Sequence, residues 1–109
     1  MELPEISVLE LRDLLESGRP PRLIDVREEN EWNICSIPGG ELCPLSQWPA
    51  IVNEKLTDRE QALVIQCHHG GRSARAGEYL LRNGFKDVKN LVGGIDAWSV
   101  HVDPSVPRY

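Results

Sequence analysis

The sequence contains no long apolar run and no cluster of basic residues. A membrane-spanning helix needs roughly eighteen or more apolar residues in succession, and no segment comes near that length. The formal net charge is −5 and the Lys and Arg residues are scattered, so we expect neither nucleic acid nor a membrane surface as a partner. The opening "MELPEISVLE" has no basic leader followed by an apolar stretch, which predicts a soluble, cytoplasmic protein.

Cysteine is also scarce. Cys35, Cys43 and Cys67 are an odd number at irregular spacing, which argues against a secreted disulfide framework and suits a reducing compartment. At least one thiol must stay free of internal pairing. No C-x-x-C pair occurs, and the adjacent Cys67, His68 and His69 are too close in sequence to be typical zinc ligands. We therefore expect no structural metal.

What the sequence does contain suits one compact domain over residues 1–109, of which 40% are hydrophobic. Short branched apolar runs predict strands at "LIDV", "ELCPL", "ALVIQC" and "DVKNL". Helices are expected at "ISVLELRDLLESG", in a short turn at "EENEW", from Ser46 through Pro49 and "AIVNEKL", at "RSARAGEYLLRNG" and at "GGIDAWS". This alternation predicts an α/β fold with a central, mostly parallel β-sheet and helices on both faces.

Two of these helices carry more detailed predictions. Ser7 and Glu10 form the capping-box pattern at the start of the first one. In the helix over residues 72–84, Ala74, Gly77 and Leu81 should lie on one face. The closing "VDPSVPRY" holds too much proline for a helix, so we expect it to lie extended over the surface.

The stretch "QCHHGGRSARAG" is the candidate site. Cys67 stands at the carboxyl end of the strand "ALVIQC", the edge where parallel sheets place their ligands. The loop of residues 67–72, called here the cysteine loop, then runs into a helix, whose free N–H groups and positive dipole end point toward the thiol. Gly70 and Gly71 let the backbone curl with its amides facing inward. Such surroundings favour a thiolate nucleophile; the other interpretation is an inert, buried structural cysteine.

Four segments, "LIDVREENEW", "IPGGELCPL", "CHHGGRS" and "NLVGGIDAW", together resemble the rhodanese-like domain, the single-domain sulfurtransferase family. The resemblance implies a parallel α/β fold and a Cys67 that carries sulfane sulfur as a persulfide. The implied partners are a small-molecule sulfur donor such as thiosulfate and a thiol or protein acceptor. No metal or organic cofactor is required.

Three charged residues are candidates for support of the thiol. By resemblance, Asp25 would hydrogen-bond near the cysteine loop and orient it, although a turn or capping role fits as well. Arg27 could draw anionic donors to the pocket, or it could be an exposed residue paired with Glu28 or Glu31. Arg72 could bind loop carbonyls or face the sulfonate of the donor, so we group it with Cys67 and Asp25 as catalytic.

The remaining loop residues are candidates for substrate binding. His68 and His69 could add positive charge or touch the donor, or their side chains could splay into solvent. Gly70 and Gly71 would offer backbone amides to the sulfur. Ser73 is expected to cap the following helix, with a hydroxyl directed at the persulfide as the alternative.

Other functions stay open. The cysteine loop reads C-x4-R, one residue shorter than the C-x5-R of related phosphatases and arsenate reductases, and the smaller ring suits one sulfur atom. A regulatory module without turnover is a second alternative. A third is a sulfur-delivery module within a larger complex, because the tail resembles those of rhodanese domains joined to adenylylating enzymes. "CSIPGG" departs from the family's common "GHIPGA", so Cys35 is either a sulfur-relay thiol or a small packing residue.

Overall fold

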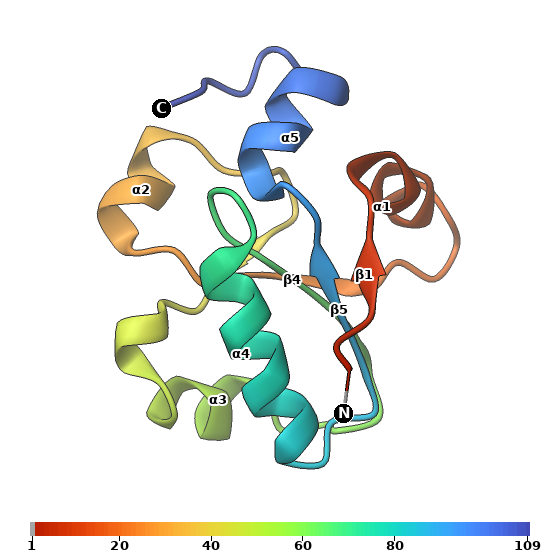
Figure 1. The fold of residues 1–109 in the computed structure, drawn as a ribbon, viewed down its shortest axis with the longest axis vertical. Coiled ribbons are helices and arrows are strands. Elements are labelled where there is room, and N and C mark those ends of the chain that lie inside the picture. Colours follow the sequence, from red (N-terminus) through yellow and green to blue (C-terminus); the bar gives the residue numbers. More distant parts are fainter. Residues whose placement is uncertain (1) are drawn as a thin grey trace.

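A five-stranded parallel sheet forms the centre of the chain (Figure 1). The computed structural model describes residues 2–109. In chain order the strands are β1 (Glu5–Ile6), β2 (Arg22–Asp25), β3 (Glu41–Leu42), β4 (Ala62–Gln66) and β5 (Asp87–Leu91). They lie in the order β1-β5-β4-β2-β3, and each adjacent pair is parallel. The expected α/β fold is confirmed.

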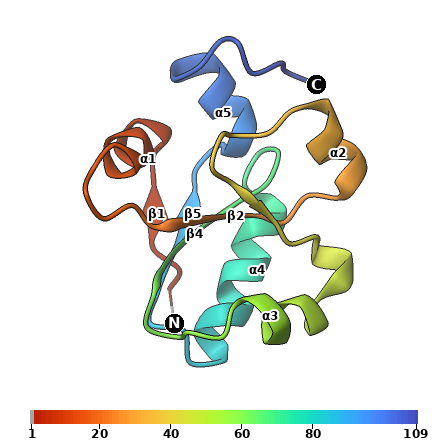
Figure 2. The same cartoon turned by 180° about the vertical axis from the view of Figure 1, so that it is seen from behind.

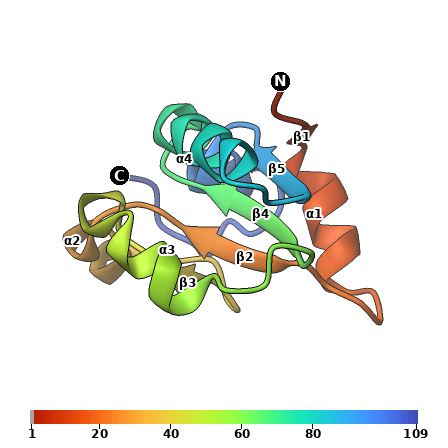
Figure 3. The same cartoon turned by 90° about the horizontal axis from the view of Figure 1, so that it is seen from below.

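Helices cover both faces of the sheet. They are α1 (Val8–Leu15), α2 (Glu29–Ile34), the 3-10 turn η1 (Leu45–Gln47), α3 (Ala50–Lys55), α4 (Gly71–Arg82) and α5 (Gly94–His101). α3 and α4 share one apolar core with the sheet, whereas α1 and α5 pack against its opposite face. Figure 3 shows α4 lying along β4 and β5, and Figure 2 shows the same layers from behind. Within residues 2–109, no helix has the length and apolar character needed to cross a bilayer.

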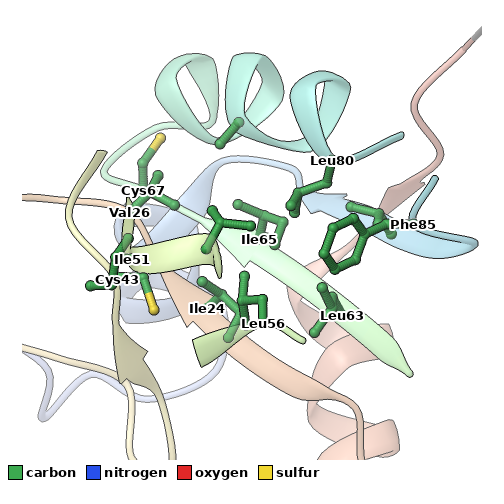
Figure 4. Packing of buried hydrophobic residues seen from close by; sticks show 13 residues of the cluster. Ile24, Val26, Cys43, Ile51, Leu56, Leu63, Ile65, Cys67, Leu80 and Phe85 are labelled. Atoms are coloured by element: carbon green, nitrogen blue, oxygen red, sulfur yellow. The ribbon is translucent and has the colours of Figure 1, made fainter. Parts of the chain in front are cut away.

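Neighbouring residues of the central strands point into different cores, as the alternation of a β-strand requires. In β4, Ile65 belongs to the core under α3 and α4, and Val64 belongs to the core under α1 and α5. Figure 4 shows the first of these cores, in which Ile65 lies below Leu80 of α4, with Phe85 at one end and Cys67 at the other. The thiol therefore lies where the apolar core meets the carboxyl ends of the strands.

The first helix begins as the sequence predicts. The Ser7 hydroxyl accepts a hydrogen bond from the Glu10 amide at 3.1 Å, and the Glu10 carboxylate accepts one from the Ser7 amide at 3.1 Å. This reciprocal capping box satisfies two N–H groups that a helix start would otherwise leave unpaired.

The helix predicted at "AIVNEKL" is confirmed as α3, but its predicted start near Ser46 is wrong, because the chain is extended at Trp48. Residues 45–47 form the short η1, Trp48 is extended (φ −81°, ψ 146°), and α3 starts only after Pro49. A proline disfavours helical geometry in the residue before it, which fits the extended backbone of Trp48.

The buried face of α4 also differs from the prediction. Of the three residues expected to share that face, Gly77 is buried while Ala74 and Leu81 are only half-buried. The residues that face inward are Ser73, Ala76, Gly77 and Leu80. The helix is rotated so that Ser73 turns toward the thiol.

Two further segments exceed what the sequence indicates. β1 was not expected, because two residues carry no detectable period. The helical turn or two predicted at "GGIDAWS" is confirmed as α5, which runs two residues further, to His101. The tail lies over the surface as expected, but it is anchored there: the Ser99 hydroxyl donates to the Val106 carbonyl, and Val106 is buried.

The turn between β5 and α5 packs directly on the cysteine loop and depends on Gly94. Gly94 has φ +56°, and a Cβ placed there would collide with the Cys67 carbonyl and lie 2.7 Å from the His68 carbonyl oxygen. We expect Gly94→Ala to lower the free energy of unfolding by more than the roughly 1–3 kcal/mol of a left-handed backbone alone. Urea unfolding measures this loss.

Gly18→Ala is the matched control. A Cβ at Gly18 meets no heavy atom within 4 Å, and its φ lies outside the left-handed region. Its unfolding midpoint should therefore stay at or above that of the parent protein. Equal midpoints for the two variants would contradict the close packing of the β5–α5 turn on the loop.

Candidate active site

The cysteine loop connects β4 to α4 at the carboxyl edge of the sheet, at the same end of the molecule as α2, α5 and the C-terminal segment (Figure 1). Gly70 has φ +115°, a left-handed conformation in which glycine is favoured, and it stands directly before the first residue of α4. This bend brings the start of the helix back over Cys67. The loop and the helix start therefore surround one sulfur atom.

Backbone N–H groups point at the Cys67 sulfur. The Gly70 amide donates to Sγ at 3.1 Å and the Ser73 amide donates at 3.4 Å. Burial by itself raises the pKa of the Cys67 thiol, but hydrogen bonds from Ser73, Gly70 and His69 outweigh it, so the pKa is lowered. Because these donors favour the charged form, the arrangement suits a thiolate.

Ser73 and Asn90 form a polar pair beneath the loop. The Ser73 hydroxyl has one hydrogen and three acceptors within reach: Asn90 Oδ1 at 2.6 Å, the Gly70 carbonyl at 3.2 Å and Cys67 Sγ at 3.4 Å. Asn90 also donates from Nδ2 to the Gly70 carbonyl at 3.2 Å. The expected capping role of Ser73 is wrong, since Gly70 holds the cap position. Asn90 was missed, and its only signal is an amide within the apolar strand "DVKNL".

The start of α5 holds the carbonyl side of the loop. The Ile95 amide donates to the Cys67 carbonyl at 2.9 Å, and the Asp96 amide donates to the His68 carbonyl at 3.1 Å. These bonds hold the Cys67 and His68 carbonyls toward α5, while the Gly70 amide points at the sulfur on the other side of the loop. The start of α5 therefore binds the loop carbonyls, and the start of α4 directs an amide at the sulfur.

A pocket of about 510 Å³ opens above the thiol. It is lined by Cys67, His68, His69, Gly71, Arg72 and Arg75. Cys67 itself is only 1% exposed, so the sulfur lies at the base of this pocket. A small molecule would approach it between the histidines and the first turn of α4.

Arg72 is paired with an acidic residue of α2. Its Nη1 and Nη2 donate to the Glu31 carboxylate at 2.6 and 2.9 Å, the two-pronged geometry that arginine favours. The hydrogen bonds from Arg72 hold the pKa of Glu31 down at about 2. Arg72 therefore lines the pocket, but its positive charge is neutralised by the Glu31 carboxylate. The expected bond from Arg72 to a loop carbonyl is not formed.

Asp25 and Arg27 form a fully buried ion pair. Arg27 Nη2 and Nε lie 2.6 and 3.0 Å from Asp25 Oδ2, and Nη2 also donates to the Cys35 carbonyl at 2.8 Å. Burial disfavours the charged guanidinium, but the Asp25 and Tyr109 hydrogen bonds raise the pKa of Arg27 above its usual value. Both expectations for an accessible Arg27 are wrong. The Asp25 carboxylate hydrogen-bonds to Arg27 and not to the cysteine loop, and because it also accepts from the Arg27 amide at 3.0 Å, the alternative turn role of Asp25 is confirmed.

Tyr109 joins these two pairs and was missed by the sequence analysis. Its hydroxyl accepts from Arg27 Nη1 at 2.9 Å and donates to Glu31 Oε2 at 2.9 Å. Its ring stacks on His68, with centroids 3.8 Å apart and planes 6° apart. Burial, with the Glu31 hydrogen bond, raises the pKa of Tyr109 to about 12. The tail thereby forms one wall of the site.

The two histidines occupy different surroundings. His68 is half-buried between Tyr109 and His69, and burial, followed by the charge of His69, lowers the pKa of His68. His69 is exposed, with Nε2 lying 3.8 Å from Asp96 Oδ2. Only His69 among the pair therefore splays toward solvent.

Within residues 2–109, one group of side chains brings metal-binding atoms together: His68, His69 and Asp96, whose ligand atoms lie within 4.8 Å of one another. The two imidazole rings are stacked on each other, with centroids 4.0 Å apart and planes 27° apart. The Asp96 carboxylate also accepts from Arg108 at 2.8 Å. This arrangement does not fit a typical tetrahedral zinc site.

The other two cysteines are buried and free. Burial raises the pKa of Cys43, which is typical of an inert thiol. Cys35 is 8% exposed and offers its carbonyl to Arg27. Packing and backbone contacts account for both residues.

Comparison with known proteins places these features in context. The family model for the rhodanese-like domain matches residues 7–101. Thiosulfate sulfurtransferase GlpE of Pseudoalteromonas translucida is 32% identical over 108 residues, covering 99% of this chain and 100% of GlpE. The probable adenylyltransferase/sulfurtransferase MoeZ of Mycobacterium tuberculosis is 38% identical over 104 residues, covering 95% of this chain and 26% of MoeZ.

Solved structures agree with the fold. A rhodanese-like domain protein from Staphylococcus aureus superimposes with a TM-score of 0.83 and 31% identity, covering 98% of this chain and 99% of that protein. The chain spans only 22% to 30% of the length of seven curated relatives, MoeZ among them.

The Ser73 hydrogen bonds predict how reactivity of the thiol depends on pH. Ser73→Ala keeps the amide bond and removes the hydroxyl bond to Sγ, so it should raise the pH at which Cys67 is half-reactive toward iodoacetamide by about one unit, the effect of one hydrogen bond to a charged group. Alkylation rates followed by intact mass across pH give this midpoint.

Ser105→Ala is the matched control, since the Ser105 hydroxyl is exposed and binds Asp103 in the tail. Cys67→Ser identifies the signal as that of Cys67. An unchanged midpoint in Ser73→Ala would show that the Ser73 hydroxyl does not stabilise the anionic sulfur, since the Ser73 amide is kept in the variant.

Proposed function

The chain belongs to the rhodanese-like domain family, and from this membership we propose that it transfers sulfane sulfur from a donor such as thiosulfate to a thiophilic acceptor through a persulfide on Cys67. Several of its relatives are named sulfurtransferases. The donor and the acceptor are proposals from chemistry. The three free cysteines suit the reducing cytoplasm, where we place the protein.

The observation that carries the proposal is the hydrogen bonding of Cys67. A buried cysteine in apolar surroundings would have a raised pKa and little reactivity. The Cys67 thiol has a lowered pKa, receives N–H groups from Gly70 and Ser73, and lies at the base of an open pocket. A nucleophilic sulfur needs this combination.

In the first half-reaction, the Cys67 thiolate attacks the outer sulfur of thiosulfate. A bond forms between Sγ and that sulfur, the sulfur–sulfur bond of the donor breaks, and sulfite leaves with the electron pair. The terminal sulfur of the persulfide keeps one negative charge. Loop amides that already point inward stabilise it without reorganisation, as in an oxyanion hole. Gly70 and Gly71 contribute backbone to the loop around the sulfur, and His68 and His69 line the pocket through which the donor enters.

In the second half-reaction, a thiophile such as cyanide or a thiolate attacks the terminal sulfur. The persulfide bond breaks, and its electron pair returns to Cys67 as thiolate. Ping-pong kinetics follow from the covalent intermediate. Arg72, Asp25 and Arg27 position the site through Glu31 and Tyr109.

A second candidate is sulfur delivery within a larger assembly. It is favoured by the small share of the matched relatives that this chain spans, including MoeZ, named an adenylyltransferase/sulfurtransferase. The chemistry at Cys67 is the same in both cases. A turnover assay with thiosulfate and cyanide separates them, because a dedicated carrier loads sulfur but passes it slowly to a small acceptor. The phosphatase alternative is less well supported, since the C-x4-R loop closes on a single atom.

Incubation with thiosulfate should add one sulfur, about 32 Da, to the intact mass, because the thiolate keeps the sulfur as a covalent persulfide. Cyanide should remove it and release thiocyanate. Cys67→Ser should gain nothing, while Cys43→Ser, at a buried thiol of raised pKa, should load like the parent. Failure to gain mass from thiosulfate, an organic thiosulfonate and a persulfide donor would reject sulfur transfer and favour the regulatory module.

A further inference from the structure

The active-site pocket contains one positively charged side chain, Arg75, that has no role in the mechanism described above. Arg75 lines the pocket together with Cys67 and Arg72. It lies three residues after Arg72 in α4, so both side chains stand on the same side of the helix, about 4.5 Å apart along its axis. Arg75 therefore lies about one helical turn further along α4 than Arg72 and still lines the same pocket.

Each other basic side chain of the pocket either lies close to a carboxylate or has a lowered pKa. Arg72 is bound at two points by Glu31. His68 is half-buried with a lowered pKa, which favours the neutral ring. His69 is exposed and faces Asp96, whose carboxylate is already bound by Arg108. None of these offers a full unpaired positive charge to an incoming molecule.

Arg75 differs from all of them. Its side chain is exposed, and within the part of the chain that the structure describes it makes neither a salt bridge nor a side-chain hydrogen bond. The acidic residue one turn further on, Glu78, lies instead 3.9 Å from Arg82. A planar guanidinium with free donors is the side chain best suited to grip a sulfonate or carboxylate.

We propose that Arg75 is the specificity-determining residue of the pocket, which binds the anionic end of the sulfur donor while its sulfane sulfur meets Cys67. This inference rests on the proposed function and adds to it the residue that binds the donor's charged end, the sulfonate or carboxylate beyond the transferable sulfur. The amides of the cysteine loop act on the reacting sulfur, and Arg75 acts on the opposite end of the donor.

The test compares two alkylating reagents of nearly equal shape, anionic iodoacetate and neutral iodoacetamide. Both react with the same thiolate, so any change in the pKa of Cys67 cancels in the ratio of their rate constants. Arg75→Gln should lower the iodoacetate-to-iodoacetamide ratio by roughly five- to tenfold, corresponding to one ionic hydrogen bond at a partly exposed site. Arg75→Lys, which keeps the charge but loses the planar fork, should fall between.

Arg19→Gln is the matched control. Arg19 is exposed, forms no salt bridge within the described residues and lies outside this pocket, so its loss removes the same charge and should leave the ratio unchanged. A ratio in Arg75→Gln equal to that of the parent, or an equal fall in Arg19→Gln, would overturn the inference. The first result would exclude anion binding by Arg75. The second would show that the ratio responds only to the net charge of the protein.

A second measurement uses the donor itself. In single-turnover loading with thiosulfate, Arg75→Gln should raise the half-saturating concentration by a similar five- to tenfold and keep the limiting rate, because only binding is affected. A parent protein that takes up no sulfur would refute the proposed function, whereas the alkylation ratio would still decide the role of Arg75.

Discussion

The structure depends on one interaction: backbone N–H groups of the cysteine loop are directed at the Cys67 sulfur. The Gly70 and Ser73 amides lie 3.1 and 3.4 Å from Sγ. A sulfur anion at the edge of an apolar core would otherwise be costly, because burial favours the neutral thiol. The hydrogen bonds reverse that preference, and they do so with groups fixed by the chain fold, so little reorganisation is needed when a persulfide forms.

Three sets of contacts keep those amides in place. Gly70 supplies the left-handed bend, the start of α5 binds the loop carbonyls, and Asn90 fastens both Gly70 and Ser73 from β5. Around the rim, Asp25, Arg27, Tyr109, Glu31 and Arg72 form a connected series of hydrogen bonds that joins β2, the tail, α2 and α4. The series contains two acidic and two basic groups and is close to neutral, which leaves the pocket's unpaired charge to Arg75.

Much of the fold could be predicted from local sequence signals. Short apolar runs marked four strands, Ser7 and Glu10 marked a helix start, and the order of elements indicated a parallel sheet. The position of Cys67 after β4 and the glycines beside it likewise indicated the thiolate loop. The predictions that failed concern residues whose positions depend on contacts between segments distant in the sequence. Arg27 looked exposed because nothing local shows that it forms a buried pair with Asp25. Tyr109 lies at least 41 residues along the chain from its three partners, Arg27, Glu31 and His68. The break at Trp48 could have been read from Pro49, whose effect on the preceding residue was overlooked.

The central claim is that the loop makes the anionic form of Cys67 favourable. Titration of the three cysteines by the chemical shifts of their 13C-labelled Cβ atoms tests it directly. The account predicts that Cys67 ionises at a pH below that of free cysteine in the same buffer, and that Cys43 ionises above it. Ionisation of Cys67 at or above the pH of free cysteine would contradict the account.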